Sequence, residues 1–254
     1  MPIEYISTED AISAQGIRMT VVSATPSAWG EAAKGIFHVK GLPWKAVRYN
    51  MMDKTQSDWI GFENAPSVVF NDEAAINGWL NILNFAENQT DIPSLVPDGS
   101  RELCLRLSDD FCGTDGLGWH RRLMAVHAGL TGKGGFALPI AQYLGLKYGY
   151  SEDRMDHAYA RMISLLTEFV SRLKSQEASG SPYYIGECLT CVDIYSACFM
   201  GFFDPLPEAH CPMHPKTRAV FKGRYLETDH AFDPILLKHR DYIYETYLEL
   251  PLSL

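Results

Sequence analysis

The sequence predicts a small α/β unit followed by a larger, all-helical unit. Two observations carry this prediction: a strand, helix, strand order near the N-terminus, and an absence of convincing strand patterns after residue 72. A third is the segment 91–99, which contains Pro93 and Pro97 and has the composition of a linker. The chain of 254 residues is long enough for two domains of ordinary size.

The first strand is expected over 18–25, where β-branched residues cluster before Pro26. A helix follows over 29–40, because apolar residues recur there at steps of three and four until Gly41. Residues 44–49 alternate between apolar and polar side chains, as a half-buried strand does. Together these segments form a βαβ beginning.

Residues 50–64 are polar and are expected to be irregular. The next strand spans 65–70 and has Pro66 near its start, the position where a sheet tolerates proline and where the preceding peptide bond can be cis. From Asp72 onward the spacing of apolar residues predicts a helix.

The remainder of the chain is expected to be helical. Candidate helices lie at 101–110, 119–130, 155–173, 190–203 and 233–248. The expected domains are therefore a sheet-bearing unit over residues 15–90 and a helical unit over residues 98–254.

Composition limits the possible partners and location. Acidic residues outnumber basic ones by 31 to 22, giving a net charge of −9, so nucleic acid is not expected as a ligand. No apolar stretch is long enough for a membrane helix, and the N-terminus lacks a signal-peptide pattern, so we expect a cytoplasmic protein with no membrane partner. Six cysteines are too few for a disulfide scaffold and are expected to be reduced, partly buried thiols.

The most specific motif surrounds Thr190 and Asp193. A threonine followed three residues later by an acidic residue, ahead of an apolar helix, predicts a capping box whose function is structural. This pattern, preceded by Tyr184-Ile-Gly186, resembles the buried capping box in the helical domain of the glutathione S-transferase family. The resemblance covers nearly the whole chain and implies a thioredoxin-like N-terminal domain followed by an all-α helical-bundle domain.

The N-terminal unit supports this resemblance at Ala65 and Pro66. In the family, a cis-proline at this point lets the preceding residue pair through its backbone with the cysteinyl part of glutathione. The resemblance implies that Ala65 supplies that backbone and Pro66 the cis bond; backbone pairing requires no particular side chain. The alternative is an ordinary proline at the start of a strand.

The turn before the first long helix is where the family places its thiol-directed residue. The segment Ser27-Ala-Trp-Gly-Glu31 is similar to the family's Cys-Pro-Phe-Ala-Glu type of turn. The similarity makes Ser27 the candidate catalytic residue and implies that Ser27 and Trp29 bind glutathione. A hydroxyl and a helix N-terminus directed at the sulfur stabilise a thiolate. The alternative is that Ser27, or Thr25, only caps the helix.

One part of the family pattern is missing. The family places Glu-Ser or Asp-Ser at the start of its third helix to bind the γ-glutamyl end of glutathione, and the matching stretch is identified as Asp72-Glu-Ala-Ala75. Glu73 is the remaining candidate for the amino group, whereas Ala74 removes the hydroxyl. The strand before it is expected to run almost directly into the helix.

The resemblance implies a glutathione transferase that uses glutathione as co-substrate, attacks a small hydrophobic electrophile in detoxification chemistry, and forms a homodimer. An apolar pocket for the electrophile is expected from helices around Phe111, Trp119 and Met124. A glutathione-dependent lyase or thiol reductase is an alternative that needs a cysteine, with Cys112 as its candidate. A binding protein that keeps the fold without activity is the other alternative.

No metal is expected. Cys188 and Cys191 stand at a helix cap and indicate neither a redox pair nor half of a zinc site. His210-Cys-Pro-Met-His214 is interpreted as a surface loop because it contains prolines and has no second cluster. Trp119-His-Arg-Arg122 is interpreted as a solvated basic turn of a helix; the alternative, which the resemblance implies, is that this helix faces the ligand cleft.

Overall fold

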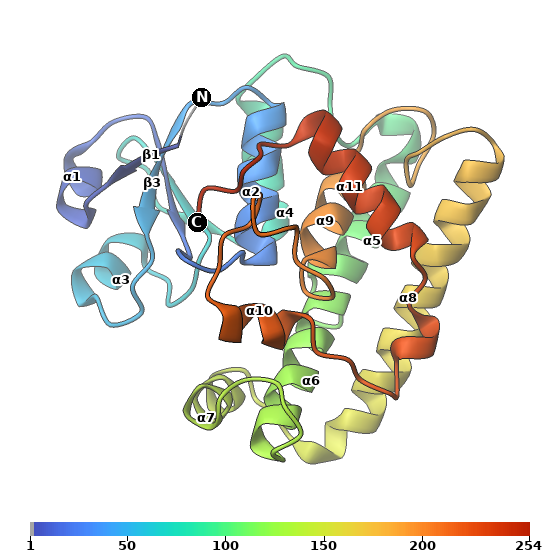
Figure 1. Ribbon diagram of the computed structural model, residues 1–254. Helices are drawn as coiled ribbons and strands as arrows, with labels where there is room; N and C mark the ends of the chain where they lie inside the picture. Colours follow the sequence, from blue (N-terminus) through green and yellow to red (C-terminus); the bar gives the residue numbers. More distant parts are fainter. Residues whose placement is uncertain (1–2) are drawn as a thin grey trace. The chain divides into compact units, whose positions relative to one another are not determined.

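The computed structural model of the protein describes residues 3–254 and divides into two compact units (Figure 1). The sheet unit comprises the chain up to Ser94 together with residues 207–213 and 244–254. The helical unit comprises residues 95–206 and 214–243. Cys211 consequently belongs to the sheet unit, although the expected bounds of the helical unit, 98–254, include it.

Within residues 3–254, the sheet unit is built on five strands in the order β1-β3-β2-β4-β5. Their bounds are β1 Glu4–Ile6, β2 Ile17–Val21, β3 Trp44–Arg48, β4 Ser67–Phe70 and β5 Ile76–Asn77. β1, β3 and β2 run parallel, whereas β4 is antiparallel to both β2 and β5. The three predicted strands are confirmed as β2, β3 and β4; β1 and β5 were not predicted.

Four helices cover the sheet. They are α1 Thr8–Ser13, α2 Ala28–Val39, α3 Lys54–Ile60 and α4 Trp79–Asn88. α2 and α4 pack together on one face, and α1 and α3 lie on the other (Figure 1). The expectation of irregular structure over 50–64 is wrong because α3 forms there. Asp53 caps α3 by accepting from Gln56 N, and Gly61 ends it with a φ of 68°.

The helix predicted to start at Asp72 begins only at Trp79. Residues 71–75 instead form the turn between β4 and β5. The buried Arg18 holds this turn, since its guanidinium donates to Asn71 O at 2.8 Å and to Gly16 O at 2.6 Å. Because this turn leads back along β4, residues Ile76–Asn77 pair with β4 as the short strand β5 before α4 begins.

The helical unit contains seven α-helices within the described residues. They are α5 Arg101–Cys112, α6 Leu117–Leu130, α7 Leu138–Lys147, α8 Met155–Ala178, α9 Cys191–Met200, α10 Pro215–Phe221 and α11 Ile235–Tyr247, the end of which belongs to the sheet unit. Short 3-10 helices occupy Asp98–Ser100, Glu152–Arg154 and Asp229–Ala231. The five predicted helices are confirmed, and α7 and α10 are additional. Across residues 3–254, no helix combines the length and apolarity that a bilayer crossing requires.

Aromatic packing fills the centre of the helical unit. The rings of Phe111 and Phe169 stack with their centroids 3.9 Å apart, and Tyr184 meets both rings edge-on. Phe111, Phe169 and Tyr184 are fully buried. Such stacked and edge-on pairs add to the stabilisation that burial of their apolar area provides.

The predicted capping box is confirmed at the start of α9. The buried Asp193 carboxylate accepts hydrogen bonds from Thr190 N and Thr190 Oγ1 at 2.8 and 2.9 Å. It also accepts from Tyr184 N at 2.8 Å and His239 Nε2 at 3.1 Å. One carboxylate therefore connects the start of α9 with the chain before it and with α11.

Replacing Thr190 by Ala is expected to lower the free energy of unfolding of the helical unit by about 1–2 kcal/mol, because a buried cap hydroxyl is lost. Urea titration followed by far-UV circular dichroism measures this change. The matched control is Thr167→Ala on the exposed face of α8, which should change stability by less than about 0.5 kcal/mol. Equal effects of the two substitutions would show that the cap has no special role.

Candidate functional site

The register of the sheet decides which candidate residues lie together. Thr20 near the end of β2 pairs with Ser67 at the start of β4, and Ser67 in turn pairs with Asn77 at the end of β5. We call this border of the sheet the Ser27 edge: it comprises Ser27, residues 64–67 and residues 77–79. The chain leaves β2 at this edge and continues into the loop that precedes Ser27.

Ser27 is the N-cap residue of α2 and is partly exposed. Its carbonyl oxygen accepts from Glu31 N at 2.7 Å, which begins the helix. Within the described chain, its hydroxyl makes no cap hydrogen bond to the helix. The hydroxyl is thus placed at the positive end of a twelve-residue helix without serving as its cap.

Two neighbouring features shape this turn. Ala24, in the loop before Ser27, has a φ of 58°, a left-handed conformation that is uncommon for a residue with a side chain. Trp29 lies in the first turn of α2 and is half-buried. Strained backbone of this kind often occurs in binding loops, where the surrounding structure maintains it.

The backbone of Ala65 is available at the same edge. The Ala65-Pro66 bond is cis, Pro66 is buried and Ala65 is half-exposed. Across residues 3–254, neither the N–H nor the C=O of Ala65 forms a hydrogen bond. Immediately afterwards Ser67 N donates to Thr20 Oγ1 at 3.0 Å, so the sheet begins one residue after the proline.

Asn77 fixes this segment and was not identified from the sequence. Its Nδ2 lies 2.8 Å from Asn64 Oδ1, 2.8 Å from Pro66 O and 2.9 Å from Ser67 Oγ. A single carboxamide therefore holds the chain on both sides of Ala65. The signal that could have revealed it is the pairing of the two-residue strand β5 with β4, which periodicity cannot detect in so short a segment.

A second helix N-terminus lies at the Ser27 edge. α4 starts directly after β5, with Gly78 as its N-cap residue at a φ of 87°. The N-termini of α2 and α4 both carry partial positive charge, which favours anions. The Ser27 edge is consequently suited to a ligand with carboxylate or thiolate groups.

Glu73 does not lie at this edge. It is exposed in the turn between β4 and β5, and Phe70, just before that turn, pairs with Ile17 at the start of β2. Glu73 is thus at the opposite end of the strands from Ser27. The prediction that residues 72–75 start the helix is wrong, and the helix start is occupied by Gly78 and Trp79. The family's acidic residue and serine are both missing there.

The expected electrophile pocket is not supported by the side chains assigned to it. Phe111 and Met124 are 0% and 1% exposed, so both belong to the core of the helical unit. Trp119 is half-buried and meets the ring of Tyr148 edge-on at 4.9 Å. Phe111 and Met124 are apolar, as expected, but they pack in the core and do not line a pocket.

The thiols do not offer an accessible nucleophile at the position expected for a reductase. Cys112 is 2% exposed, and burial raises its pKa well above the usual value. A hydrogen bond from Cys191 lowers the pKa of Cys104 to about 7, yet Cys104 is fully buried. Within residues 3–254 no cysteine forms a disulfide bond, and only Cys188 is exposed. The lyase or reductase alternative thus loses its candidate residue.

The segment Trp119-His-Arg-Arg122 is not a solvated basic turn. His120 and Arg121 are 4% and 5% exposed. Arg121 donates to Phe202 O at 2.8 Å and to Gly223 O at 2.7 Å, and its guanidinium lies over the ring of Tyr225. It anchors the connection that follows α9. His210 and His214 are exposed, in agreement with the surface-loop interpretation.

Solved structures provide the strongest comparison. A glutathione transferase family member from Pseudomonas fluorescens, with two glutathione bound, has 14% identity and a TM-score of 0.62, and covers 96% of this chain and 98% of its own. A glutathione S-transferase from Methylobacillus flagellatus with GSH bound gives 12% identity, a TM-score of 0.59, and coverage of 91% and 95%. A glutathione S-transferase from Methylobacterium radiotolerans, in complex with glutathione sulfonate, has 16% identity and a TM-score of 0.58, and covers 94% of this chain and 98% of its own.

These similarities establish the fold. The chain has the glutathione S-transferase fold, with a thioredoxin-like α/β unit and an all-helical unit, as the sequence predicted. No protein-family model matches the chain, and no curated protein matches it either.

Replacing Asn77 by Ala is expected to loosen residues 64–67 and to lower stability by about 1–2 kcal/mol, because several polar groups lose their shared partner. Hydrogen exchange measured by mass spectrometry should show faster exchange in this segment. Asn81→Ala is the control, since the Asn81 carboxamide donates only to Asn77 O at 2.9 Å, at an exposed site. Unchanged exchange at 64–67 in the Asn77 variant would contradict the role assigned to Asn77.

Proposed function

We propose that the protein is a glutathione transferase-like enzyme that binds glutathione at the Ser27 edge. One observation carries the proposal: three kinds of group occupy the same border of the sheet. They are the Ser27 hydroxyl, which makes no cap hydrogen bond to α2, the unpaired backbone of Ala65, and two helix N-termini. Glutathione offers a peptide backbone, two carboxylates and a thiol, which are complementary to these groups. The glutathione bound in the structurally similar transferases supports this assignment.

Ser27 is the proposed catalytic residue. A free thiol ionises near pH 8.5, so only a few per cent is thiolate at neutral pH. Lowering the thiol pKa by ~2 units requires about 2.7 kcal/mol of preferential stabilisation of the anion. A hydroxyl donating to the sulfur contributes about 1.5–3 kcal/mol, and a helix N-terminus adds about 0.3–1 kcal/mol. The required stabilisation therefore lies within the combined range of about 1.8–4 kcal/mol that these two groups can supply.

The proposed reaction is conjugation. The thiol proton passes to solvent, the thiolate forms a carbon–sulfur bond with a small hydrophobic electrophile, and the leaving group departs with its bonding electrons. A serine cannot form a mixed disulfide with glutathione, which favours conjugation over disulfide exchange. Detoxification of electrophiles is the biological role that such chemistry serves.

A non-catalytic binding protein is the second candidate, and Gly78 favours it. The residue at the start of α4 has no side chain, and Trp79 follows it, so neither can supply a carboxylate or a hydroxyl to the γ-glutamyl end. The two candidates differ in an observable way. An enzyme turns over an electrophile in the presence of glutathione, whereas a binding protein with the same fold does not.

Ser27→Ala is expected to reduce kcat/KM for conjugation of glutathione with an activated aryl chloride by about 10- to 100-fold at neutral pH. Losing the hydroxyl removes stabilisation of the anion, so the thiol pKa seen in the pH profile should rise. The deficit should therefore shrink as the pH is raised above the pKa of the free thiol. Kinetics across pH and retention on immobilised glutathione measure both effects.

Thr25→Ala is the matched control, because Thr25 lies outside the helix and two residues before Ser27. It should retain at least about half of the activity, since it removes no group from the helix start. A loss in Thr25→Ala as large as in Ser27→Ala would transfer the role to Thr25. Absence of both retention and thiol-dependent turnover in the unmodified protein would leave the non-catalytic candidate.

We also propose that the protein acts as a cytoplasmic homodimer. The resemblance to the transferase family supports the dimer, and the acidic net charge of −9 is compatible with a dissolved protein. Light scattering coupled to size exclusion should give about twice the chain mass of 28.5 kDa. A mass equal to that of a single chain at micromolar concentration would contradict the dimer.

A further inference from the structure

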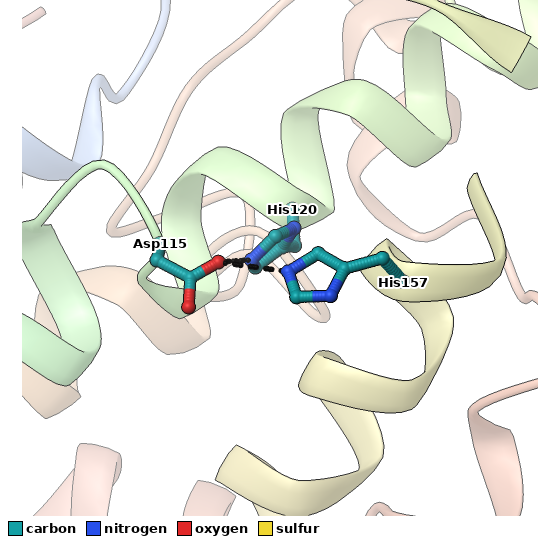
Figure 2. Close-up of side chains that lie close together, drawn as sticks. All are labelled: Asp115, His120 and His157. Carbon is teal, nitrogen blue, oxygen red and sulfur yellow. Dashed lines mark hydrogen bonds and ion pairs between the residues drawn. The ribbon is translucent and has the colours of Figure 1, made fainter. Parts of the chain in front are cut away.

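Three side chains that are far apart in the sequence meet in the helical unit. Asp115 lies in the loop between α5 and α6, His120 on α6 and His157 in the first turn of α8 (Figure 2). Asp115 Oδ1 accepts from His120 Nε2 at 2.9 Å and from His157 Nε2 at 3.1 Å. The three potential ligand atoms lie within 4.8 Å of one another.

The backbone of the α5–α6 loop sets the position of Asp115. A Cβ at Gly113 would overlap the Asp109 side chain, and one at Gly116 would lie 2.7 Å from Asp109 O. Because only glycine fits at both positions, the loop folds closely onto the end of α5. This places the Asp115 carboxylate beside the start of α6, within hydrogen-bond distance of His120.

The cluster combines one buried residue, His120, with two exposed residues, Asp115 and His157. His120 is nine-tenths or more buried, and its Nδ1 has no hydrogen-bond partner among the described residues. Among the described residues, the hydrogen bond of the His120 ring is the one from Nε2 to Asp115 Oδ1. The side chains of Asp115 and His157 are 59% and 62% exposed, so an ion can approach from solvent.

Arg161 holds Asp115 in place. Its Nε donates to Asp115 O at 3.2 Å and lies 3.2 Å from Asp115 Oδ2, and its NH2 group donates to Asp110 Oδ1 at 2.7 Å. The positive charge is consequently shared between two carboxylates. Oδ2 faces the guanidinium and Oδ1 faces the two imidazoles, which is the arrangement expected of a ligating carboxylate supported by an outer partner.

The donor set and its spacing define the class of ligand. Zinc ligands at about 2.0–2.2 Å in a tetrahedron are about 3.3–3.6 Å apart. The two Nε2 atoms lie 2.9 and 3.1 Å from Asp115 Oδ1, slightly closer than this spacing, and all three ligand atoms lie within 4.8 Å of one another. Small side-chain adjustments would therefore bring the three atoms around one ion. Two imidazoles with one carboxylate suit zinc and similar divalent transition metals, whereas Ca²⁺ and Mg²⁺ prefer oxygen ligands alone.

We propose that Asp115, His120 and His157 form a binding site for a divalent transition-metal ion, with Zn²⁺ as its representative. The ion takes Oδ1 of Asp115 and Nε2 of each histidine, and water fills the fourth position. In replacing two hydrogen bonds, it links the α5–α6 loop, α6 and α8. The site is independent of the glutathione function proposed for the sheet unit.

The test is a titration of the full chain, first freed of metal by a chelator. Isothermal calorimetry with zinc chloride should give one site per chain, and Co²⁺ should develop the visible absorption of a tetrahedral centre. Asp115→Asn and His157→Ala should each weaken zinc binding by at least about tenfold. Removing a residue that only hydrogen-bonds a metal ligand already costs about tenfold or more, and these substitutions change the ligands themselves. Both positions are exposed, so the fold should persist, and circular dichroism checks this.

His210→Ala is the matched control, because His210 is an exposed histidine outside the cluster. It should bind zinc as tightly as the unmodified chain does. The proposal is overturned if the unmodified chain binds no stoichiometric zinc at micromolar concentration. It is equally overturned if Asp115→Asn or His157→Ala binds zinc with unchanged affinity, or if His210→Ala abolishes the site.

Discussion

The antiparallel pairing of β2 with β4 is the constraint on which the candidate site depends. With Thr20 opposite Ser67, the end of β2 and the start of β4 lie at one border of the sheet, and Asn77 of β5 pairs with Ser67 there. A slip of one residue would turn every side chain of β4 to the other face of the sheet. It would also separate Ala65 from the turn that contains Ser27.

Each unit is further organised around a buried charge that is satisfied by hydrogen bonds. In the sheet unit, Arg18 donates to three backbone carbonyls, which fixes the turn after β4. In the helical unit, Asp193 accepts from the backbone of Thr190 and Tyr184 and from His239. Buried charges are costly unless every partner is present, so these contacts specify one arrangement of the chain more strongly than apolar packing alone does.

Local patterns allowed much of the fold to be predicted, and long-range pairing accounts for the errors. The capping box at Thr190 depends on four consecutive residues, so it was visible in the sequence. The strand Ile76–Asn77 forms only because β4 lies beside it, so it was not predicted. Without that strand, the prediction placed the helix start and Glu73 at the Ser27 edge, whereas Glu73 lies at the opposite end of the strands. Phe111 was assigned to a pocket because it is apolar, and the sequence could not show that the ring of Phe169 covers it. The meeting of His120 with His157 depends on packing of α6 against α8, which no local pattern reveals.

The central claim is that glutathione binds where the starts of α2 and α4 meet the beginning of β4. Amide chemical shifts of the isotope-labelled full chain, recorded by NMR as glutathione is added, test it most directly. Binding at the Ser27 edge should give the largest saturable changes at Ser27, Ala65 and Gly78, with little change in the turn at 71–75. Saturable changes centred on that turn, or no changes at millimolar glutathione, would contradict it.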